Sequence, residues 1–185
     1  MISPDSRILL DAIRFSADKH RNQRRKNEEA SAYINHPIEV AEMLVSVGNV
    51  EDLDTVIAAI LHDTIEDTDT TPEEIERLFG KDVLSMVLEC TDDKTLPKAT
   101  RKQLQIEHAP HISRGAKQVK IADKISNILD ITHSPPVHWP LERKMEYLDW
   151  AEQVITGLRG ANPNLEKYFD EVVRRARKKL GAAGC

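Results

Sequence analysis

The segment AAILHDTIEDTDT, residues 58–70, places a histidine and several carboxylates directly after an apolar run. His62 and Asp63 follow six consecutive apolar residues at 56–61, a pattern typical of a helix that is buried on all sides. We therefore expect both side chains to emerge inside the protein. Glu66 and Asp67 follow at the three- and four-residue spacings that place side chains on one helix face. Such a concentration of carboxylates is unfavourable unless a positive group lies among them.

The alternative for this segment is an acidic helix end with an incidental histidine. Carboxylates at a helix C-terminus oppose the helix dipole, so this arrangement would cost free energy. Two further residues favour a metal site instead. His36 directly precedes the proline in YINHPIEVA, and Asp123 lies on an otherwise apolar face in VKIADKISNILD. Each also has an ordinary explanation, because His36 could be a helix cap or a core residue and Asp123 could pair with a buried lysine.

His36, His62, Asp63 and Asp123 together form a set of two imidazoles and two carboxylates. Nitrogen and oxygen ligands without a thiolate suit a borderline or hard divalent cation such as Mn²⁺, Fe²⁺ or Zn²⁺. The sequence therefore predicts one divalent metal site, with two further carboxylates one turn away.

A basic run, KHRNQRRK at residues 19–26, could bind an anion near this site. Arginine and lysine are the usual partners of phosphate oxygens. The alternative is a solvated helix end.

The elements that must position these residues are helices. Apolar residues recur at helical spacing along nearly the whole chain, whereas period-two alternation and hairpin dipeptides are nearly absent. We therefore expect an all-α fold of about eight or nine helices around one core. The expected helices lie near residues 8–15, 37–47, 53–66, 72–80, 81–91, 98–108, 116–131, 141–158 and 164–180.

The 185 residues, 40% of them hydrophobic and 31% charged, predict a single domain at 1–185 with its core at about 5–180. The net charge of −5 disfavours a general nucleic-acid binder. No apolar run reaches the roughly 20 residues of a membrane span, and we expect no signal peptide. Cys90 and Cys185 form neither a disulfide framework nor a zinc motif, which favours a reducing, cytoplasmic setting. The oligomeric state stays open.

The order of these residues resembles the HD superfamily of metal-dependent phosphohydrolases. It is most similar to the small, single-domain SpoT/RelA-type guanosine-3′,5′-bis(diphosphate) 3′-pyrophosphohydrolases. The segments that carry the resemblance cover much of residues 15–155 in the expected order: YINHPIEVA, AAILHDTIEDTDT, ECTDDKTLPK and VKIADKISNILD. The HD pair alone is a weak signal, but HDTIED with a preceding NHP and a following ADKxxN is specific.

The resemblance implies a compact HD-domain helical fold around one metal site. It implies hydrolysis of the 3′-diphosphate of the alarmone (p)ppGpp, the nucleotide of the stringent response, to GDP or GTP and pyrophosphate. One divalent cation, most often Mn²⁺, would be held by His36, His62, Asp63 and Asp123. Glu66 and Asp67 would be catalytic and act through water. Substrate contacts are implied for Arg25, Lys26, Asn127, Lys98, Arg143 and Tyr147, although Tyr147 could equally belong to a core face.

Two other functions stay open on these residues. One is an HD phosphohydrolase for another nucleotide: a nucleoside monophosphate, a cyclic nucleotide or NADPH 2′-phosphate. The other is a non-catalytic nucleotide-binding regulator, which would have no need for Glu66 and Asp67 beside the metal ligands. In each case the expected partner is a small-molecule nucleotide, not a nucleic acid or a membrane. The chain has no room for a synthetase domain, so we expect degradation of the alarmone and not its synthesis.

Overall fold

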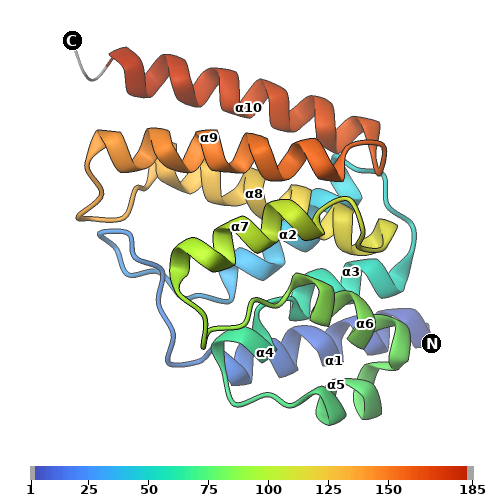
Figure 1. Cartoon of the computed structure of the whole chain (residues 1–185). Helices are drawn as coiled ribbons and strands as arrows, with labels where there is room; N and C mark the ends of the chain where they lie inside the picture. The colour runs from blue at the N-terminus through green and yellow to red at the C-terminus, as the bar shows by residue number, and fades with distance from the viewer. Residues whose placement is uncertain (1–2, 183–185) are drawn as a thin grey trace.

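The computed structural model describes residues 3–182, and within this range it contains ten helices and no strand (Figure 1). The all-α prediction is confirmed, whereas Cys185 lies outside the described residues. The helices are α1 (Pro4–Lys19), α2 (Asn35–Ser46), α3 (Leu53–Leu61), α4 (Thr64–Asp67), α5 (Pro72–Phe79), α6 (Lys81–Cys90), α7 (Lys98–His108), α8 (Arg114–His133), α9 (Leu141–Leu158) and α10 (Pro163–Ala182).

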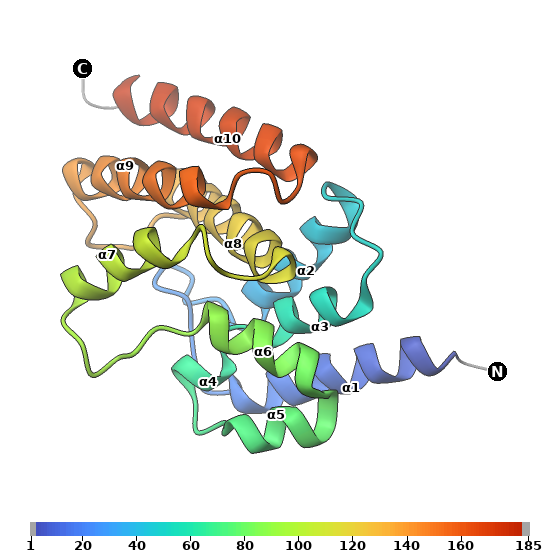
Figure 2. The ribbon, with the colours of Figure 1, turned by 45° about the vertical axis from the view of Figure 1, so that its right-hand side comes forward.

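Helix α8 is the centre of the arrangement. It packs against α2, α3, α6, α9 and α10. In both views α9 and α10 lie at one end of the molecule, and α1 and α5 lie at the opposite end (Figures 1 and 2). Residues on α8 are therefore fixed by neighbours on nearly every side.

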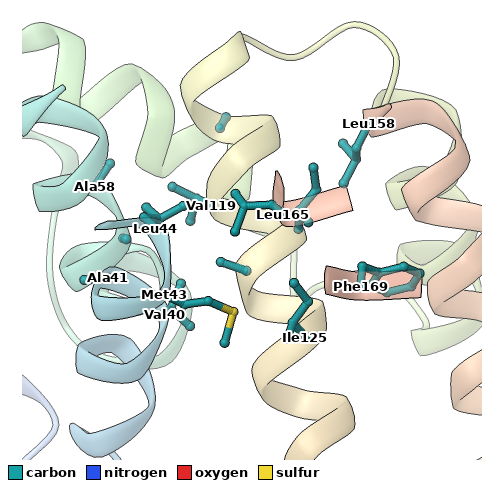
Figure 3. Close-up of a cluster of buried hydrophobic side chains, with 14 of the residues drawn as sticks. Val40, Ala41, Met43, Leu44, Ala58, Val119, Ile125, Leu158, Leu165 and Phe169 are labelled. Atoms are coloured by element: carbon teal, nitrogen blue, oxygen red, sulfur yellow. The ribbon is translucent and has the colours of Figure 1, made fainter. Parts of the chain in front are cut away.

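The core forms where α2, α8 and α10 meet (Figure 3). Leu44 of α2, Ile125 of α8 and Phe169 of α10 are at most 1% exposed. The cluster of buried apolar side chains extends from Ala12 in α1 to Leu180 in α10. Burial of this apolar surface is the main stabilising contribution to the fold.

Local sequence signals set several helix starts. The Thr71 hydroxyl accepts the backbone N–H of Glu74, and the Glu74 carboxylate accepts the backbone N–H of Thr71. This capping box satisfies two amide groups that the first turn of α5 would otherwise leave free. None of the helices in residues 3–182 has the length and apolar composition that crossing a membrane would require.

The prediction of one continuous helix over residues 53–66 is wrong. The chain instead forms two helices, α3 and α4, with His62 and Asp63 between them. This division explains why the structure has more helices than the eight or nine expected.

Two side chains explain the break. Nδ1 of His62 donates to the carbonyl oxygen of Ala59 at 2.7 Å, and the Thr64 hydroxyl donates to that of Leu61, also at 2.7 Å. In an uninterrupted helix these carbonyls would accept amide protons from four residues further along the chain. Because side chains compete for the carbonyls, the helix can end without leaving them unpaired.

Truncating the core should test this packing. Leu44→Ala should lower the free energy of unfolding by about 2–5 kcal/mol, because Leu44 is fully buried and its loss leaves a cavity. Leu10→Ala is the matched control, because Leu10 is 59% exposed and its truncation should change stability by about 0.5 kcal/mol or less. Urea denaturation followed by circular dichroism measures both. Equal losses in the two variants would contradict the described core.

Candidate functional site

The structure brings the four predicted metal ligands to one point. His36 comes from the start of α2, His62 and Asp63 from the break between α3 and α4, and Asp123 from the middle of α8. Nε2 of His36 lies 3.2 Å from Oδ1 of Asp123 and 3.8 Å from Oδ2 of Asp63. Nε2 of His62 lies 3.2 Å from Oδ2 of Asp63 and 3.9 Å from Oδ1 of Asp123.

The imidazole of His62 is oriented as a metal ligand would be. Its Nδ1–H is committed to the carbonyl of Ala59, so Nε2 is the atom that faces the carboxylates. Oδ2 of Asp63 lies 3.2 Å away but outside hydrogen-bond geometry, so within residues 3–182 this buried Nε2 makes no hydrogen bond. A buried polar atom without a partner is unusual and points to a group that the protein residues do not supply.

The second imidazole, that of His36, is held by a relay from α8 and α2. The Ser126 hydroxyl donates its proton to Oε2 of Glu39 at 2.8 Å, so it can only accept from Nδ1 of His36 at 3.0 Å. Nε2 of His36 therefore faces Asp63 and Asp123. Such outer contacts fix the tautomer and the ring direction of metal-binding histidines.

Each carboxylate of the set is also held by neighbours. The Tyr33 hydroxyl donates to Oδ2 of Asp63 at 2.5 Å. The Asn127 amide donates to Oδ1 of Asp123 at 2.6 Å, and Nζ of Lys124 lies 2.8 Å from its Oδ2. The buried lysine pair that was the ordinary explanation for Asp123 is therefore present, but it uses only one carboxylate oxygen. The other oxygen faces the histidines.

The charges at this position favour a cation. Burial alone would raise the pKa values of Asp63 and Asp123. The imidazoles of His62 and His36 outweigh it at Asp63, and Lys124 and the same imidazoles outweigh it at Asp123, so both pKa values lie well below their usual range. Burial would lower the pKa of His62, yet the two carboxylates raise it to about 9. The space between them attracts positive charge, and a divalent cation competes there with a proton. Two imidazole nitrogens and two carboxylate oxygens fit such a cation.

Two more carboxylates lie beside this set, on α4. Glu66 accepts the backbone N–H of Asp92 at 3.0 Å, and burial together with neighbouring carboxylates raises the pKa of Glu66. Asp67 accepts from Nε2 of Gln23 at 2.7 Å and pairs with Lys94. Both side chains are less than one-fifth exposed and line the same cavity as the four ligand candidates.

Three adjoining cavities make up the site. The histidine cavity, of about 230 Å³, contains the four ligand candidates together with Glu66 and Asp67. The arginine cavity, of about 500 Å³, is lined by Arg25, Lys26 and Asn127 among others. The lysine cavity, of about 390 Å³, is lined by Lys26, Lys98 and Arg143 among others. Tyr147 lines all three, so its ring stands where the cavities join.

Five basic side chains and three carboxylates line the lysine cavity, so its lining has an excess of positive charge. Burial and the neighbouring charges of Arg143, Lys26 and Arg101 lower the pKa of Lys98. The guanidinium of Arg143 lies 4.2 Å from the centre of the Trp139 ring, which holds it without neutralising it. An anionic ligand would relieve this repulsion.

The basic run at residues 19–26 divides between two roles. Arg25 donates from Nε to Asp130 at 3.0 Å and from its terminal nitrogen to Asn127 at 3.0 Å, so it is held inside the arginine cavity. Lys19 lies 3.2 Å from both Asp69 and Glu74, and none of the three cavities includes it. Neither a purely solvated helix end nor a continuous phosphate-binding segment describes the run.

Several residues at the site were not predicted from the sequence. Tyr33 and Ser126 lie inside the segments YINHPIEVA and VKIADKISNILD, where only other residues were predicted to act. Lys94 lies in the loop before α7, where no helical periodicity indicates which way a side chain points. Their roles depend on contacts with residues 27 to 90 positions away in sequence.

Comparison with known proteins places this geometry in a family. A family model described as HD domain matches residues 12–147. Guanosine-3′,5′-bis(diphosphate) 3′-pyrophosphohydrolase MESH1 of Xenopus tropicalis is 51% identical over 171 residues, which cover 92% of this chain and 96% of that protein. The protein of the same name from Homo sapiens is 53% identical over 167 residues, covering 90% and 93%. A solved structure described as a metazoan ortholog of SpoT that hydrolyzes ppGpp matches with a TM-score of 0.89, at 42% identity, over 95% of this chain and 97% of that one.

Removing the Tyr33 hydroxyl should test the candidate metal centre. Tyr33→Phe should weaken binding of a divalent cation by about tenfold, because Asp63 loses the donor that orients it. Isothermal titration calorimetry with Mn²⁺ measures the affinity. Tyr168→Phe, on α10 away from the three cavities, is the matched control. Equal affinities in the two variants would exclude this role for Tyr33.

Proposed function

The chain belongs to the HD domain family, among the small guanosine-3′,5′-bis(diphosphate) 3′-pyrophosphohydrolases, and we propose that it hydrolyses the 3′-diphosphate of (p)ppGpp to give GDP or GTP and pyrophosphate. The observation that carries this proposal is the junction of the three cavities. A cation-binding set with two extra carboxylates opens directly onto two cavities lined by basic residues. A nucleotide with two diphosphates needs both environments.

The proposed metal ligands are His36, His62, Asp63 and Asp123, and the proposed cation is Mn²⁺. The even share of nitrogen and oxygen donors, without a thiolate, suits Mn²⁺ as it suits Fe²⁺ or Zn²⁺, and the choice of Mn²⁺ among them follows the resemblance to the family. When bound, such a cation polarises a phosphoryl oxygen and lowers the pKa of a nearby water.

Glu66 and Asp67 are the proposed catalytic residues. Hydrolysis breaks the bond between O3′ and the adjacent phosphorus, consumes one water, and requires a proton on the leaving O3′. Two carboxylates at the edge of the histidine cavity can orient that water, accept its proton and return one to O3′. The raised pKa of Glu66 suits its carboxyl group to hold a proton.

The basic cavities suit the rest of the nucleotide. Arg25, Lys26 and Asn127 would contact the guanosine part in the arginine cavity, and Lys98 and Arg143 would contact the 5′-phosphates in the lysine cavity. Tyr147 would stand between them. The volumes of about 500 and 390 Å³ are in the range of small-molecule sites.

We further propose that residues 1–185 form one hydrolase domain with its core at about 5–180. The apolar cluster that runs from α1 to α10 supports this division. The cysteine usage supports a cytoplasmic location.

The reaction itself is the first test. Metal-stripped protein mixed with guanosine 3′,5′-bis(diphosphate) should give GDP and pyrophosphate only when Mn²⁺ is added, as followed by anion-exchange chromatography. Turnover that does not depend on the metal would contradict the proposed centre. Substrate bound but unchanged in the presence of Mn²⁺ would favour a regulator, and neither binding nor turnover would favour another phosphorylated nucleotide.

The two carboxylates can be separated from the metal ligands by substitution. Glu66→Gln and Asp67→Asn should each lower kcat by about 10²- to 10⁴-fold, because proton transfer and water orientation are lost. Affinity for Mn²⁺ in calorimetry should stay close to that of the unsubstituted protein. Asp63→Ala should instead abolish Mn²⁺ binding and turnover together.

Glu73→Gln is the control for these carboxylate substitutions, because Glu73 is exposed on α5. It should leave kcat unchanged. Full activity in both the Glu66 and Asp67 variants would show that the acid–base assignment is wrong.

A further inference from the structure

A chain of two hydrogen bonds leads from a buried histidine to Asp67. Nδ1 of His20 lies 2.7 Å from Oε1 of Gln23, and Nε2 of Gln23 lies 2.7 Å from Oδ2 of Asp67. His20 directly follows α1 and is 1% exposed. Neither His20 nor Gln23 belongs to the metal set or to the proposed catalytic pair.

The directions of these hydrogen bonds follow from chemistry. An ionised Asp67 carboxylate can only accept, so Gln23 must present its amide N–H groups to it. The carbonyl oxygen of Gln23 then points the other way and can only accept, so His20 must donate from Nδ1. His20 therefore carries a proton on Nδ1, and both hydrogen bonds are donated in the direction of Asp67.

The structure also suggests why the buried residue is a histidine. Within the described part of the chain, Nε2 of His20 is buried and has no hydrogen-bond partner. Leaving such an atom unpaired costs about 1–3 kcal/mol. A phenylalanine would fill this position without that cost, so packing alone does not account for an imidazole here. The Nδ1–H that it offers to Gln23 does.

We propose that His20 and Gln23 are positioning residues for the reaction: their two hydrogen bonds hold the Asp67 carboxylate in its working orientation. This inference rests on the proposed function, in which Asp67 is one of the catalytic pair. The two oxygens of Asp67 are held differently. Oδ2 is bound to Gln23, which the buried His20 supports, whereas Oδ1 is bound to Lys94, whose side chain is 49% exposed. Lys94 can move toward a phosphate while Gln23 keeps the carboxylate in place.

The same imidazole lies against a second support of the site. The rings of His20 and Tyr33 have their centres 4.9 Å apart, and the Tyr33 hydroxyl donates to Asp63. His20 therefore supports Asp63 through Tyr33 and Asp67 through Gln23. A substitution at His20 must be designed to separate the donor from the ring.

The test compares three variants. Gln23→Met keeps the length of the side chain but removes both hydrogen bonds, and should lower kcat by about 10- to 100-fold, the loss expected for a hydrogen bond to a charged group. His20→Phe keeps a ring against Tyr33 but has no donor, and should lower kcat similarly. His20→Asn places an N–H near the position of Nδ1 and should keep most of the activity. KM and the affinity for Mn²⁺ should each stay within about threefold of the values for the unsubstituted protein.

Gln103→Met, on the exposed side of α7 and outside the three cavities, is the matched control for Gln23→Met. The double variant His20→Phe with Gln23→Met should be no slower than the worse single variant, because both act through Asp67. An active His20→Phe with an inactive His20→Asn would overturn the proposal in favour of ring packing. A normal kcat in Gln23→Met would also overturn it. So would a loss of kcat accompanied by equal losses of Mn²⁺ affinity and of the free energy of unfolding measured in urea.

Nuclear magnetic resonance tests the chain without turnover. Long-range ¹H–¹⁵N spectra should show a proton on Nδ1 of His20, and the side-chain amide signals of Gln23 should shift in Asp67→Asn. A His20 ring protonated only on Nε2, or Gln23 amide signals that do not change in Asp67→Asn, would overturn the proposal. If the unsubstituted protein does not hydrolyse guanosine 3′,5′-bis(diphosphate), the proposed function fails. These spectra still show whether the two hydrogen bonds from His20 through Gln23 to Asp67 are present.

Discussion

The carbonyl oxygens of Ala59 and Leu61 accept side chains, His62 and Thr64, where a continuous helix would offer backbone amides. The rest of the site depends on this exchange. Adjacent side chains on a helix diverge by about 100°. Nε2 of His62 and Oδ2 of Asp63 nevertheless lie 3.2 Å apart at the break. Helix α4 begins directly after Asp63, and its two carboxylates line the same cavity.

The site concentrates carboxylates in partly buried positions, where an unpaired charge would be costly. Cations from different elements compensate. Lys124 of α8 pairs with one oxygen of Asp123, and Lys94 from the loop before α7 pairs with Asp67. Among the described side chains, the oxygens that remain between His36 and His62 pair with these two imidazoles and with no lysine or arginine. The protein thus neutralises the surroundings of the site and leaves its centre for a divalent ion.

The proposed metal ligands and the proposed phosphate contacts lie on helices that differ in burial. Asp123 and Asn127 lie on α8, which has neighbours on nearly all sides. Lys98, Arg101 and Lys102 lie on α7, where no residue is fully buried. A metal centre requires ligands held within a fraction of an ångström, which a packed central helix provides. Charged contacts with phosphate tolerate a more exposed helix.

Local signals predicted much of the fold. The capping box at Thr71 and Glu74 and the apolar periodicity of α9 act within a few residues, so the helix limits of α5 and α9 were predicted closely. The break at His62 was not predicted, because apolar periodicity does not show which groups donate hydrogen bonds to the backbone carbonyl oxygens. Tyr33 and Lys94 were not predicted either, because their partners lie 30 and 27 residues away.

The sequence by itself determined the helical class, most helix limits and the types of groups that could bind a metal, because helix formation and ligand chemistry are properties of neighbouring residues and of side chains. Only the tertiary structure decided that these groups face one another. It also decided that Gln23 turns toward Asp67 while Lys19 turns away, and that Tyr147 stands where the three cavities join. Those outcomes depend on the packing of helices distant in sequence, which no local pattern records.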